Sequence, residues 1–313
     1  MRFLVTGGAG FIGSSLIDDL LTAGHSVVCM DNFDSYYDET IKRKNIHNHY
    51  NYANYQLIER DIRSDLSRLP ECDTIIHLAA RAGVRPSILQ PMLYQSVNIE
   101  GTQNLLEFAK VREIKKFIFA SSSSVYGVNP NTPWREDDYV LNPISPYAAT
   151  KIAGELIGHS YAYLYPIQFI GLRFFTVYGP RQRPDLAIHK FTRAIIEESP
   201  IEFYGDGSTS RDYTYISDIV SGIKGAINYD KEKFAIFNLG NCRTTTLKQL
   251  VEKLEIIIGK SAIFNHQPLQ PGDVPVTFAD VTKSQRELGY NPETPIDIGL
   301  EKFVKWYLEE RCV

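Results

Sequence analysis

Residues 2–13 of the chain read RFLVTGGAGFIG, an apolar run followed by glycines at positions 7, 10 and 13. The run 3–5 is typical of a buried strand, and a helical pattern over 11–23 follows the glycines directly. Glycines in this spacing arise by chance in roughly one such chain in ten, so the spacing alone is a weak signal and their position between a strand and a helix is the stronger one. There they permit a tight turn and bring the N–H groups of a helix N-terminus against a pyrophosphate. The segment predicts the first unit of a dinucleotide-binding fold.

Further strands are predicted by short β-branched apolar runs that do not alternate with polar residues, which indicates strands covered on both faces. They lie at 26–30, 56–59, 74–77, 117–120 and 168–173. Helices are expected between them at 92–110 and 147–164. Strands that alternate with helices predict a doubly wound α/β fold with a parallel sheet of the Rossmann type.

The regular alternation of strands and helices ends after the last of these strands, which predicts a second domain. We expect residues 1–175 to form the dinucleotide-binding Rossmann domain, with returning segments near 212–238 and 274–281. Residues 176–211 and 239–313 are then a smaller, mixed α/β domain that binds the substrate. Its helices, and that of the first returning segment, are expected near 187–197, 217–229, 246–258 and 296–310.

The composition is that of a folded enzyme, with 313 residues, of which 43% are hydrophobic and 22% charged. A net charge of −4 lacks the positive excess that nucleic-acid binding needs, so we expect no nucleic-acid partner. No apolar run could span a membrane and the N-terminus is a poor signal peptide, so we expect a cytoplasmic protein with no membrane contact. The cysteines show no metal-binding or disulfide spacing, so we expect them reduced and mostly buried, and no metal. They are Cys29, Cys72, Cys242 and Cys312.

Asp31 ends the second predicted strand, 18 residues after Gly13. A carboxylate there accepts hydrogen bonds from both ribose hydroxyls of an adenosine and repels a 2′-phosphate, which favours NAD over NADP. Asp61 and Ile62 either flank the adenine or cap a helix. The basic group 42–44, beside His47 and His49, is expected to be a solvated helix face. We expect NAD to contact Gly7, Gly10, Phe11, Ile12, Gly13, Asp31, Asn32, Asp61, Ile62, Leu78, Ala79, Ala80, Tyr147 and Lys151.

The segment YAATK places Tyr147 and Lys151 one helical turn apart on one face. With 19 tyrosines in the chain this spacing means little alone, and a second match, Tyr229 and Lys233, occurs. We interpret the second pair as a solvated helix end without acid–base function. The first pair differs because serines 121–124 end a strand upstream of it, at the carboxyl edge where open α/β sheets bind ligands.

The run SSSSVYG at 121–127, with Tyr147 and Lys151, resembles the extended short-chain dehydrogenase/reductase family of NAD-dependent nucleotide-sugar epimerases and dehydratases, over nearly the whole chain. The resemblance implies that the serine four residues before Tyr126, Ser122, is catalytic. Removing hydride from a sugar carbon needs a base for the hydroxyl proton. We expect Tyr147 to be that base and Ser122 to hydrogen-bond the reacting oxygen. Lys151 is expected to anchor the nicotinamide ribose and, from about 5 Å, to favour the ionised tyrosine by on the order of 3 kcal/mol.

Ser123 and Ser124 stand where the related 4,6-dehydratases carry the Asp and Glu that eliminate water. Without a carboxyl acid–base pair, dehydration has no obvious proton carrier. Removal of hydride and its return to the opposite face, which epimerises C4, is the better interpretation. Three further segments, at 173–187, 210–213 and 270–275, resemble the UDP-glucuronate 4-epimerase branch, whose members interconvert UDP-glucuronate and UDP-galacturonate.

In that branch Arg211 would hold the diphosphate of UDP and Asp273 would approach its ribose. Thr176 and Gln270 replace the Asn and Arg usual in UDP-glucose 4-epimerases. The hydroxyl groups of Ser122, Ser123, Ser124 and Thr176 are expected to hold the sugar carboxylate out of the alignment that decarboxylation needs. We expect substrate contacts from Arg85, Ser122, Ser123, Ser124, Thr176, Arg211 and Asp273.

Other interpretations stay open at this point. A UDP-glucose or UDP-N-acetylglucosamine 4-epimerase and a UDP-glucuronate decarboxylase keep the fold and change the substrate or outcome. A redox-responsive dinucleotide sensor has no need for Ser122, Tyr147 and Lys151 together. The resemblance also implies a homodimer, in which the helices at 92–110 and 147–164 of two copies pair as a four-helix bundle.

Overall fold

The computed structural model describes residues 1–269 and 272–311. Its centre is a seven-stranded sheet in which each neighbouring pair runs parallel. The order along the sheet is β11-β6-β5-β4-β1-β2-β3. These strands are β1 (Arg2–Thr6), β2 (Ser26–Asp31), β3 (Tyr55–Glu59), β4 (Thr74–His77), β5 (Lys116–Ser122), β6 (Gln168–Phe174) and β11 (Phe234–Leu239).

The doubly wound fold predicted from the sequence is confirmed. The chain passes from β1 outward to β2 and β3, then returns to the other side of β1 for β4, so the strand order reverses beside β1. Ligands of open α/β sheets bind where this reversal occurs, at the carboxyl ends of the strands. The glycine-rich turn that follows β1 lies at that point.

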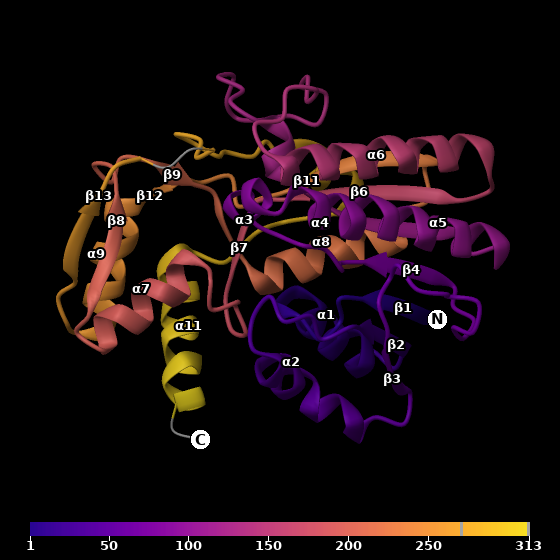
Figure 1. Cartoon of the computed structure of the whole chain (residues 1–313), viewed down its shortest axis with the longest axis horizontal. Helices are drawn as coiled ribbons and strands as arrows, with labels where there is room; N and C mark the ends of the chain where they lie inside the picture. Colours follow the sequence, from indigo (N-terminus) through magenta and orange to yellow (C-terminus); the bar gives the residue numbers. More distant parts are fainter. Residues whose placement is uncertain (270–271, 312–313) are drawn as a thin grey trace.

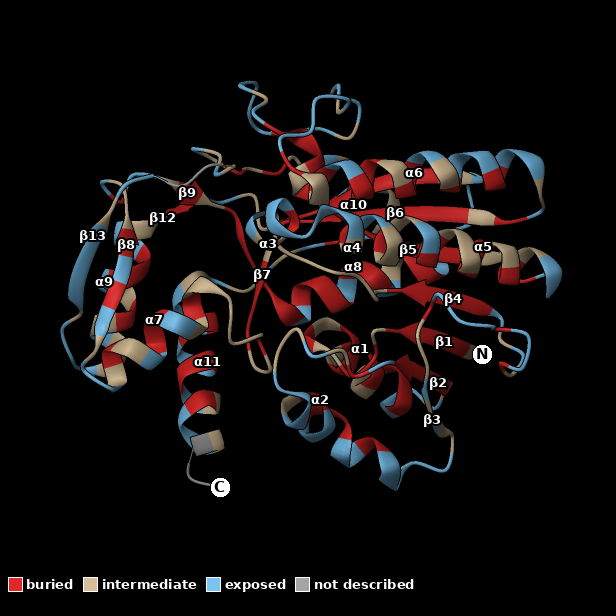
Figure 2. Cartoon of the chain, in the orientation of Figure 1, coloured by how far each residue is buried: buried red, intermediate tan, exposed pale blue. Residues whose placement is uncertain are grey.

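Helices cover both faces of the sheet, which explains the apolar runs of the strands (Figure 1). Phe3 and Val5 of β1 pack in one core with α1 (Phe11–Thr22) and α8 (Ile216–Asn228). Leu4, which points to the opposite face, packs in a second core with α5 (Gly101–Val111) and α6 (Pro146–Leu164). Figure 2 shows as buried the sides of the strands and helices that face these two cores.

The long helix predicted at 92–110 is confirmed as one continuous helical segment, but it contains a π-helical turn. The chain forms α4 (Pro91–Gln95), one π-helical turn, η2 (Ser96–Glu100), and then α5. The cause is tertiary, because the buried Asn98 amide in that turn donates to the Arg81 carbonyl and to the Thr150 hydroxyl, both at 3.0 Å. Short helices α3 (Val84–Leu89) and α10 (Thr282–Leu288) were not predicted, whereas α2 (Glu39–Ile46) contains the helix face expected at 42–44.

A smaller region lies beside the carboxyl edge of the sheet (Figure 1). It contains the parallel pair β8 (Pro200–Tyr204) and β13 (Ile263–Gln267) with α7 (Ala187–Ile196), α9 (Leu247–Ile258) and α11 (Ile296–Arg311). Two short pairs connect it to the sheet region, β7 (Thr176–Tyr178) with β10 (Tyr213–Tyr215) and β9 (Ser210–Arg211) with β12 (Thr245–Thr246). The domain boundaries proposed from the sequence stay a prediction.

Two further expectations concern membrane contact and cysteines. Within residues 1–269 and 272–311, no helix has the length and apolar character of a membrane span. Cys29, Cys72 and Cys242 are free thiols, the first buried and the others half-buried. Cys312 lies outside the described residues.

Candidate active site

One cavity of about 810 Å³ lies between the carboxyl edge of the sheet and the smaller region. It is lined by the strand ends at Asp31, Ser122 and Phe174 and, from the smaller region, by residues such as Tyr204 and Leu247. Gln270, one of the substrate-branch markers, lies outside the described residues. Every site residue predicted from the sequence borders this cavity: Gly7, Gly10, Phe11, Ile12, Gly13, Asp31, Asn32, Asp61, Ile62, Leu78, Ala79, Ala80, Arg85, Ser122, Ser123, Ser124, Tyr147, Lys151, Thr176, Arg211 and Asp273.

The glycine-rich turn forms one wall of the cavity with bare backbone. Gly7 has a φ of +68°, and a Cβ there would lie 2.8 Å from the Ala79 nitrogen. A Cβ on Gly13 would lie 2.3 Å from the Gly7 carbonyl oxygen, nearer than atoms can approach. Gly10 caps α1 without a side-chain hydrogen bond. The first N–H groups of α1 are thus free to meet an anion, as a dinucleotide pyrophosphate requires.

Asp31 stands at the end of β2 and is held on both oxygens. Oδ2 accepts from the Ala9 N–H at 3.2 Å, and Oδ1 accepts from the Phe33 N–H at 2.9 Å. Lys42 pairs with Oδ1 at 3.3 Å. The prediction of a solvated face at 42–44 is therefore wrong for Lys42, whose side chain is 9% exposed and faces the cavity. His49 is buried as well.

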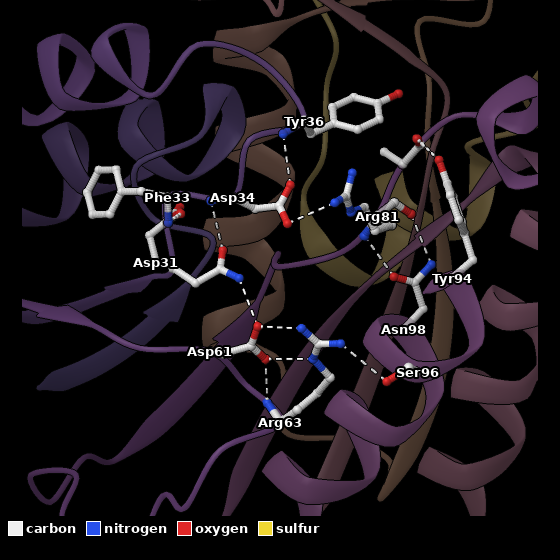
Figure 3. A network of polar contacts seen from close by, with 12 residues as sticks. Asp31, Phe33, Asp34, Tyr36, Asp61, Arg63, Arg81, Tyr94, Ser96 and Asn98 are labelled. Carbon is white, nitrogen blue, oxygen red and sulfur yellow. Dashed lines mark hydrogen bonds and ion pairs between the residues drawn. The ribbon is translucent and has the colours of Figure 1, made fainter. Parts of the chain in front are cut away.

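Asp61 is the centre of a polar cluster beyond β3 (Figure 3). It accepts from Asn32 at 2.9 Å and from the Arg63 guanidinium at 2.8 and 2.9 Å. Mainly because of the hydrogen bonds from Arg63, the pKa of Asp61 falls to about 2. The loops after β2 and β3 are thereby joined at the end of the cavity where Asp31 lies.

Tyr36 lies between two guanidinium groups. The carbon Cζ of Arg81 is 5.4 Å from its ring centre and that of Arg183 is 5.3 Å away. Arg81 also pairs with Asp34 at 2.9 Å, and Asn98 binds its backbone N–H, as Figure 3 shows. This cluster connects the loops after β2 and β4 with the loop after β7.

Ser122, Tyr147 and Lys151 meet where β5 ends and α6 begins. Ser145 caps α6 by accepting from the Ala148 N–H at 3.1 Å, which fixes the first turn that carries Tyr147. The side chain of Ser122 hydrogen-bonds Tyr147. Lys151 Nζ donates to the Ala120 carbonyl at 2.6 Å and lies 5.8 Å from the Tyr147 ring centre.

The charges around Tyr147 differ from the sequence-based expectation. Burial raises the pKa of Tyr147, while the Ser122 hydrogen bond and the charge of Arg183 lower it. Burial also lowers the pKa of Lys151 to about 7, against the opposing charge of Glu155. The expected help from the Lys151 charge is therefore opposed by burial, because the lysine begins to lose its proton near neutral pH.

The other end of the cavity carries cations around one carboxylate. Asp273 pairs with Arg85 at 2.9 Å and approaches Arg211 at 3.9 Å. Arg211 also donates to the Ser210 carbonyl at 2.8 Å. Thr176, which begins β7, borders the cavity together with the serines that follow β5.

The sequence analysis missed several charged or aromatic residues that line the cavity, among them Tyr36, Lys42, Arg81 and Arg183. Arg183 lies in a segment that the resemblance pointed to, but nothing in the spacing separates it from the neighbouring Arg181. Tyr36 and Arg81 belong to loops without any recognisable pattern.

The second tyrosine–lysine pair lies away from the cavity. Tyr229 follows α8, is 4% exposed and packs edge-on against Phe237. The prediction that it is a solvated helix end is wrong, because the end of α8 turns this ring into the core. Lys233 is exposed.

The chain was compared with known proteins. The family model described as GDP-mannose 4,6-dehydratase matches residues 4–303. The chain belongs to this family. It is 40% identical over 314 residues to a UDP-glucuronate 4-epimerase of Thermodesulfobacterium geofontis, covering 98% of this chain and 96% of that protein.

Two solved structures are similar along the whole chain. One is the UDP-glucuronic acid 4-epimerase of Bacillus cereus in complex with UDP-glucuronic acid and NAD, with a TM-score of 0.94 and 38% identity, covering 99% of this chain and 100% of that one. The other is a UDP-glucose 4-epimerase of Thermotoga maritima with UDP-glucose, with a TM-score of 0.91 and 32% identity, covering 99% and 100%. Both have the fold described above.

Proposed function

We propose that the protein is an NAD-dependent UDP-sugar 4-epimerase that interconverts UDP-glucuronate and UDP-galacturonate. The observation that carries this proposal is the meeting of Ser122, Tyr147 and Lys151 in one cavity, with serines at positions 123 and 124. The similarity to the UDP-glucuronate 4-epimerases supports the acidic sugar.

The residues at the glycine-rich end fit NAD. The backbone of Gly7 and Gly13 leaves no room for side chains, the start of α1 offers N–H groups, and Asp31 offers a carboxylate for ribose hydroxyls. The neighbouring epimerase structure holds NAD with the sugar nucleotide. Bound NAD supplies the reversible hydride acceptor that oxidation at C4 of the sugar requires.

The chain's own groups then handle the proton on the C4 oxygen. Tyr147 accepts this proton when C4 is oxidised and returns it after the sugar has turned over. Ser122 hydrogen-bonds the reacting oxygen. Positive charge on Lys151 and Arg183 favours the ionised tyrosine. Because Ser123 and Ser124 cannot act as a carboxyl acid–base pair, the 4-keto sugar is reduced again rather than dehydrated.

The sugar's carboxylate is the group that distinguishes glucuronate from glucose. In the 4-keto sugar this carboxylate is β to a ketone, so carbon dioxide leaves if the C5–carboxylate bond stands perpendicular to the carbonyl plane. We propose that Ser123, Ser124 and Thr176 hydrogen-bond the carboxylate and hold it out of that alignment. The same contacts discriminate against a neutral hexose.

The nucleotide has to stay fixed while the sugar turns its other face. Arg211 is suited to the diphosphate, because its planar guanidinium offers several donors. Asp273, which Arg85 and Arg211 approach in the structure, is suited to the ribose. Strong contacts to UDP and weaker contacts to the sugar permit the rotation that epimerisation needs.

We also propose that the protein is a homodimer in the cytoplasm. Leu89 and Tyr163 are 83% and 81% exposed, and Met92 and Leu156 are exposed as well. These side chains lie on α3, α4 and α6, next to a shallow groove along η2. Pairing of two copies through this face would cover them. Light scattering during size exclusion should give twice the chain mass, and Leu156→Arg should return a monomer.

The decisive experiment supplies the purified protein with UDP-glucuronate and UDP-glucose in separate reactions and follows the products by proton NMR. UDP-galacturonate should form at least tenfold faster than UDP-galactose. Tyr147→Phe should abolish the reaction, whereas Tyr229→Phe, a matched change at the tyrosine outside the cavity, should leave it unchanged. Conversion of UDP-glucose alone would make the protein a UDP-glucose 4-epimerase instead.

A further inference from the structure

The loop at 179–186, between β7 and α7, carries Arg183 into the cavity. Two hydrogen bonds of 2.9 Å join the Arg183 guanidinium to Asp185, and the guanidinium lies over the ring of Tyr36. Its charge acts on Tyr147, which it makes more acidic. The conformation of this loop therefore determines whether a positive charge stands beside the proposed base.

The loop holds one residue in an unfavourable backbone conformation. Arg181 has a φ of +67°. A residue with a Cβ populates this left-handed region roughly tenfold less than the right-handed one, whereas glycine enters it freely. The turn is closed by the Gln182 N–H, which donates to the Gly179 carbonyl at 3.1 Å. A contact outside the loop is needed to offset the strain at Arg181.

That contact is made on α1. Arg181 donates to Oδ2 of Asp18 at 2.6 Å. The other oxygen of Asp18 contacts Nε2 of the buried His49 at 2.7 Å, so the carboxylate is fixed from two sides. Burial acts to raise the pKa of Asp18, but the hydrogen bond from His49 and the charge of Arg181 lower it overall. In Figure 1 the segment after β7 passes between α11 and α1.

We propose that Asp18 is a positioning residue, whose ion pair with Arg181 holds the 179–186 loop in the conformation that presents Arg183 to the active site. Neither Asp18 nor Arg181 borders the cavity, so both act through the loop. The inference rests on the proposed function, since it concerns the charge beside Tyr147.

Partly exposed ion pairs contribute little to protein stability in general, and a neighbouring ion pair on α1 provides a comparison within this chain. Asp19, the next residue of α1, pairs with Lys224 at 2.9 Å. This ion pair does not involve the 179–186 loop. Asp19→Asn removes one ion pair from α1, whereas Asp18→Asn removes the pair with Arg181 and also alters the contact with His49, which Arg181→Ala leaves in place. A purely structural role for such pairs would make the two variants alike.

The first measurement is hydrogen exchange by mass spectrometry on the full-length protein, which needs no activity. Peptides covering 179–186 should exchange at least fivefold faster in Asp18→Asn than in the wild type. Their exchange rate in Asp19→Asn should equal that of the wild type. Equal exchange of this loop in the two variants would overturn the proposal, whatever reaction the protein catalyses.

The second measurement is epimerisation of UDP-glucuronate by the NAD-loaded variants. Tyr147 is faced by Lys151, Arg183, Tyr36 and Tyr94, of which only Arg183 belongs to the 179–186 loop. Asp185 of the same loop pairs with Arg183 and contacts the Tyr36 hydroxyl. Asp18→Asn should lower kcat about tenfold, and the acid limb of its pH profile should move to higher pH. Asp19→Asn should stay within twofold with an unmoved limb. If kcat falls in both variants in proportion to the fall in their melting temperatures, the positioning role is refuted.

Arg181 offers a variant that separates strain from charge. Arg181→Ala loses the ion pair and keeps the strained φ, whereas Arg181→Gly loses the pair and the strain together. Arg181→Gly should therefore retain several-fold more activity than Arg181→Ala. The reverse order would show that activity does not depend on the conformation of the 179–186 loop. If the wild type fails to epimerise while exchange rises only in Asp18→Asn, the proposed function fails and the positioning of the loop stands.

Discussion

Replacing Lys151 by methionine tests how the site ionises its tyrosine. Burial lowers the pKa of Lys151 to about 7 and raises that of Tyr147 above its usual value of 10. Between these two pH values the pair holds one proton that either residue can carry. The useful arrangement, phenolate beside ammonium, belongs to this one-proton state, so the wild type becomes active as pH rises through about 7.

The size of the effect follows from the separation of the two groups. Nζ of Lys151 lies 5.8 Å from the Tyr147 ring centre. At an effective dielectric constant near 20, this separation gives an attraction of about 3 kcal/mol between ammonium and phenolate. That energy corresponds to about 2 pKa units, or about 100-fold in the population of phenolate. Methionine keeps much of the length and the packing of the lysine stem over Phe119, and removes the charge.

The assay is kcat/KM for UDP-glucuronate between pH 6 and pH 10.5. The acid limb should lie near pH 7 in the wild type and above pH 10 in Lys151→Met, with about 100-fold less activity at pH 7.5. Activity of the variant should recover as pH rises, because Tyr147 then ionises without help. Lys110→Met, which removes an ammonium from α5 outside the cavity, should match the wild type.

Loss of cofactor has to be separated from loss of charge, because Lys151 is also proposed to anchor the nicotinamide ribose. NAD released by denaturation should be measured for both variants, and NAD added where it is missing. A Lys151→Met enzyme with full NAD and an acid limb still near pH 7 would refute the shared-proton account. The same holds if the variant stays inactive up to pH 10.5.

Three further changes test other parts of the site. Gly13→Ala places a Cβ 2.3 Å from the Gly7 carbonyl oxygen, so the purified variant should retain at least tenfold less NAD, read from its absorbance at 260 nm after denaturation. Thr176→Ala should release more UDP-pentose per turnover, measured by NMR, and an unchanged ratio would exclude Thr176 as the carboxylate clamp. Burial raises the pKa of Asp212 to about 6, so the folded state binds this proton more tightly than the unfolded state. The free energy of urea unfolding should then fall by about 3 kcal/mol in total as pH rises from well below 4 to above 7, relative to Asp212→Asn, with about 2 kcal/mol of this fall between pH 4 and pH 6.

The sheet and its binding edge could be predicted because local patterns determine them. Apolar runs mark strands that are covered on both faces, and glycines 7 and 13 are needed where backbone meets backbone. The residues of the cofactor end follow these strand ends directly in the sequence. Their common position at one edge is therefore a consequence of the parallel topology alone.

Features that depend on contacts between distant segments could not be predicted. The charged run 42–44 is typical of a solvated helix, and only the packing of α2 against α1 brings Lys42 to Asp31. The helix at 92–110 contains a π-helical turn where Asn98 binds Arg81 and Thr150. Arg183 borders the cavity through a loop whose strained residue is held from α1.

The two tyrosine–lysine pairs show what a local motif leaves undetermined. Tyr229 and Lys233 have the spacing of Tyr147 and Lys151, yet the first ring is packed in the core and its lysine is exposed. At Tyr147 the lysine is not the only charge that counts, because burial works against both residues. A hydroxyl at the end of β5 and a guanidinium from the loop after β7 act on the same phenol. The spacing supplies a tyrosine and a lysine in reach of each other, and the meeting of three distant segments at the sheet edge makes that pair suitable for moving a proton.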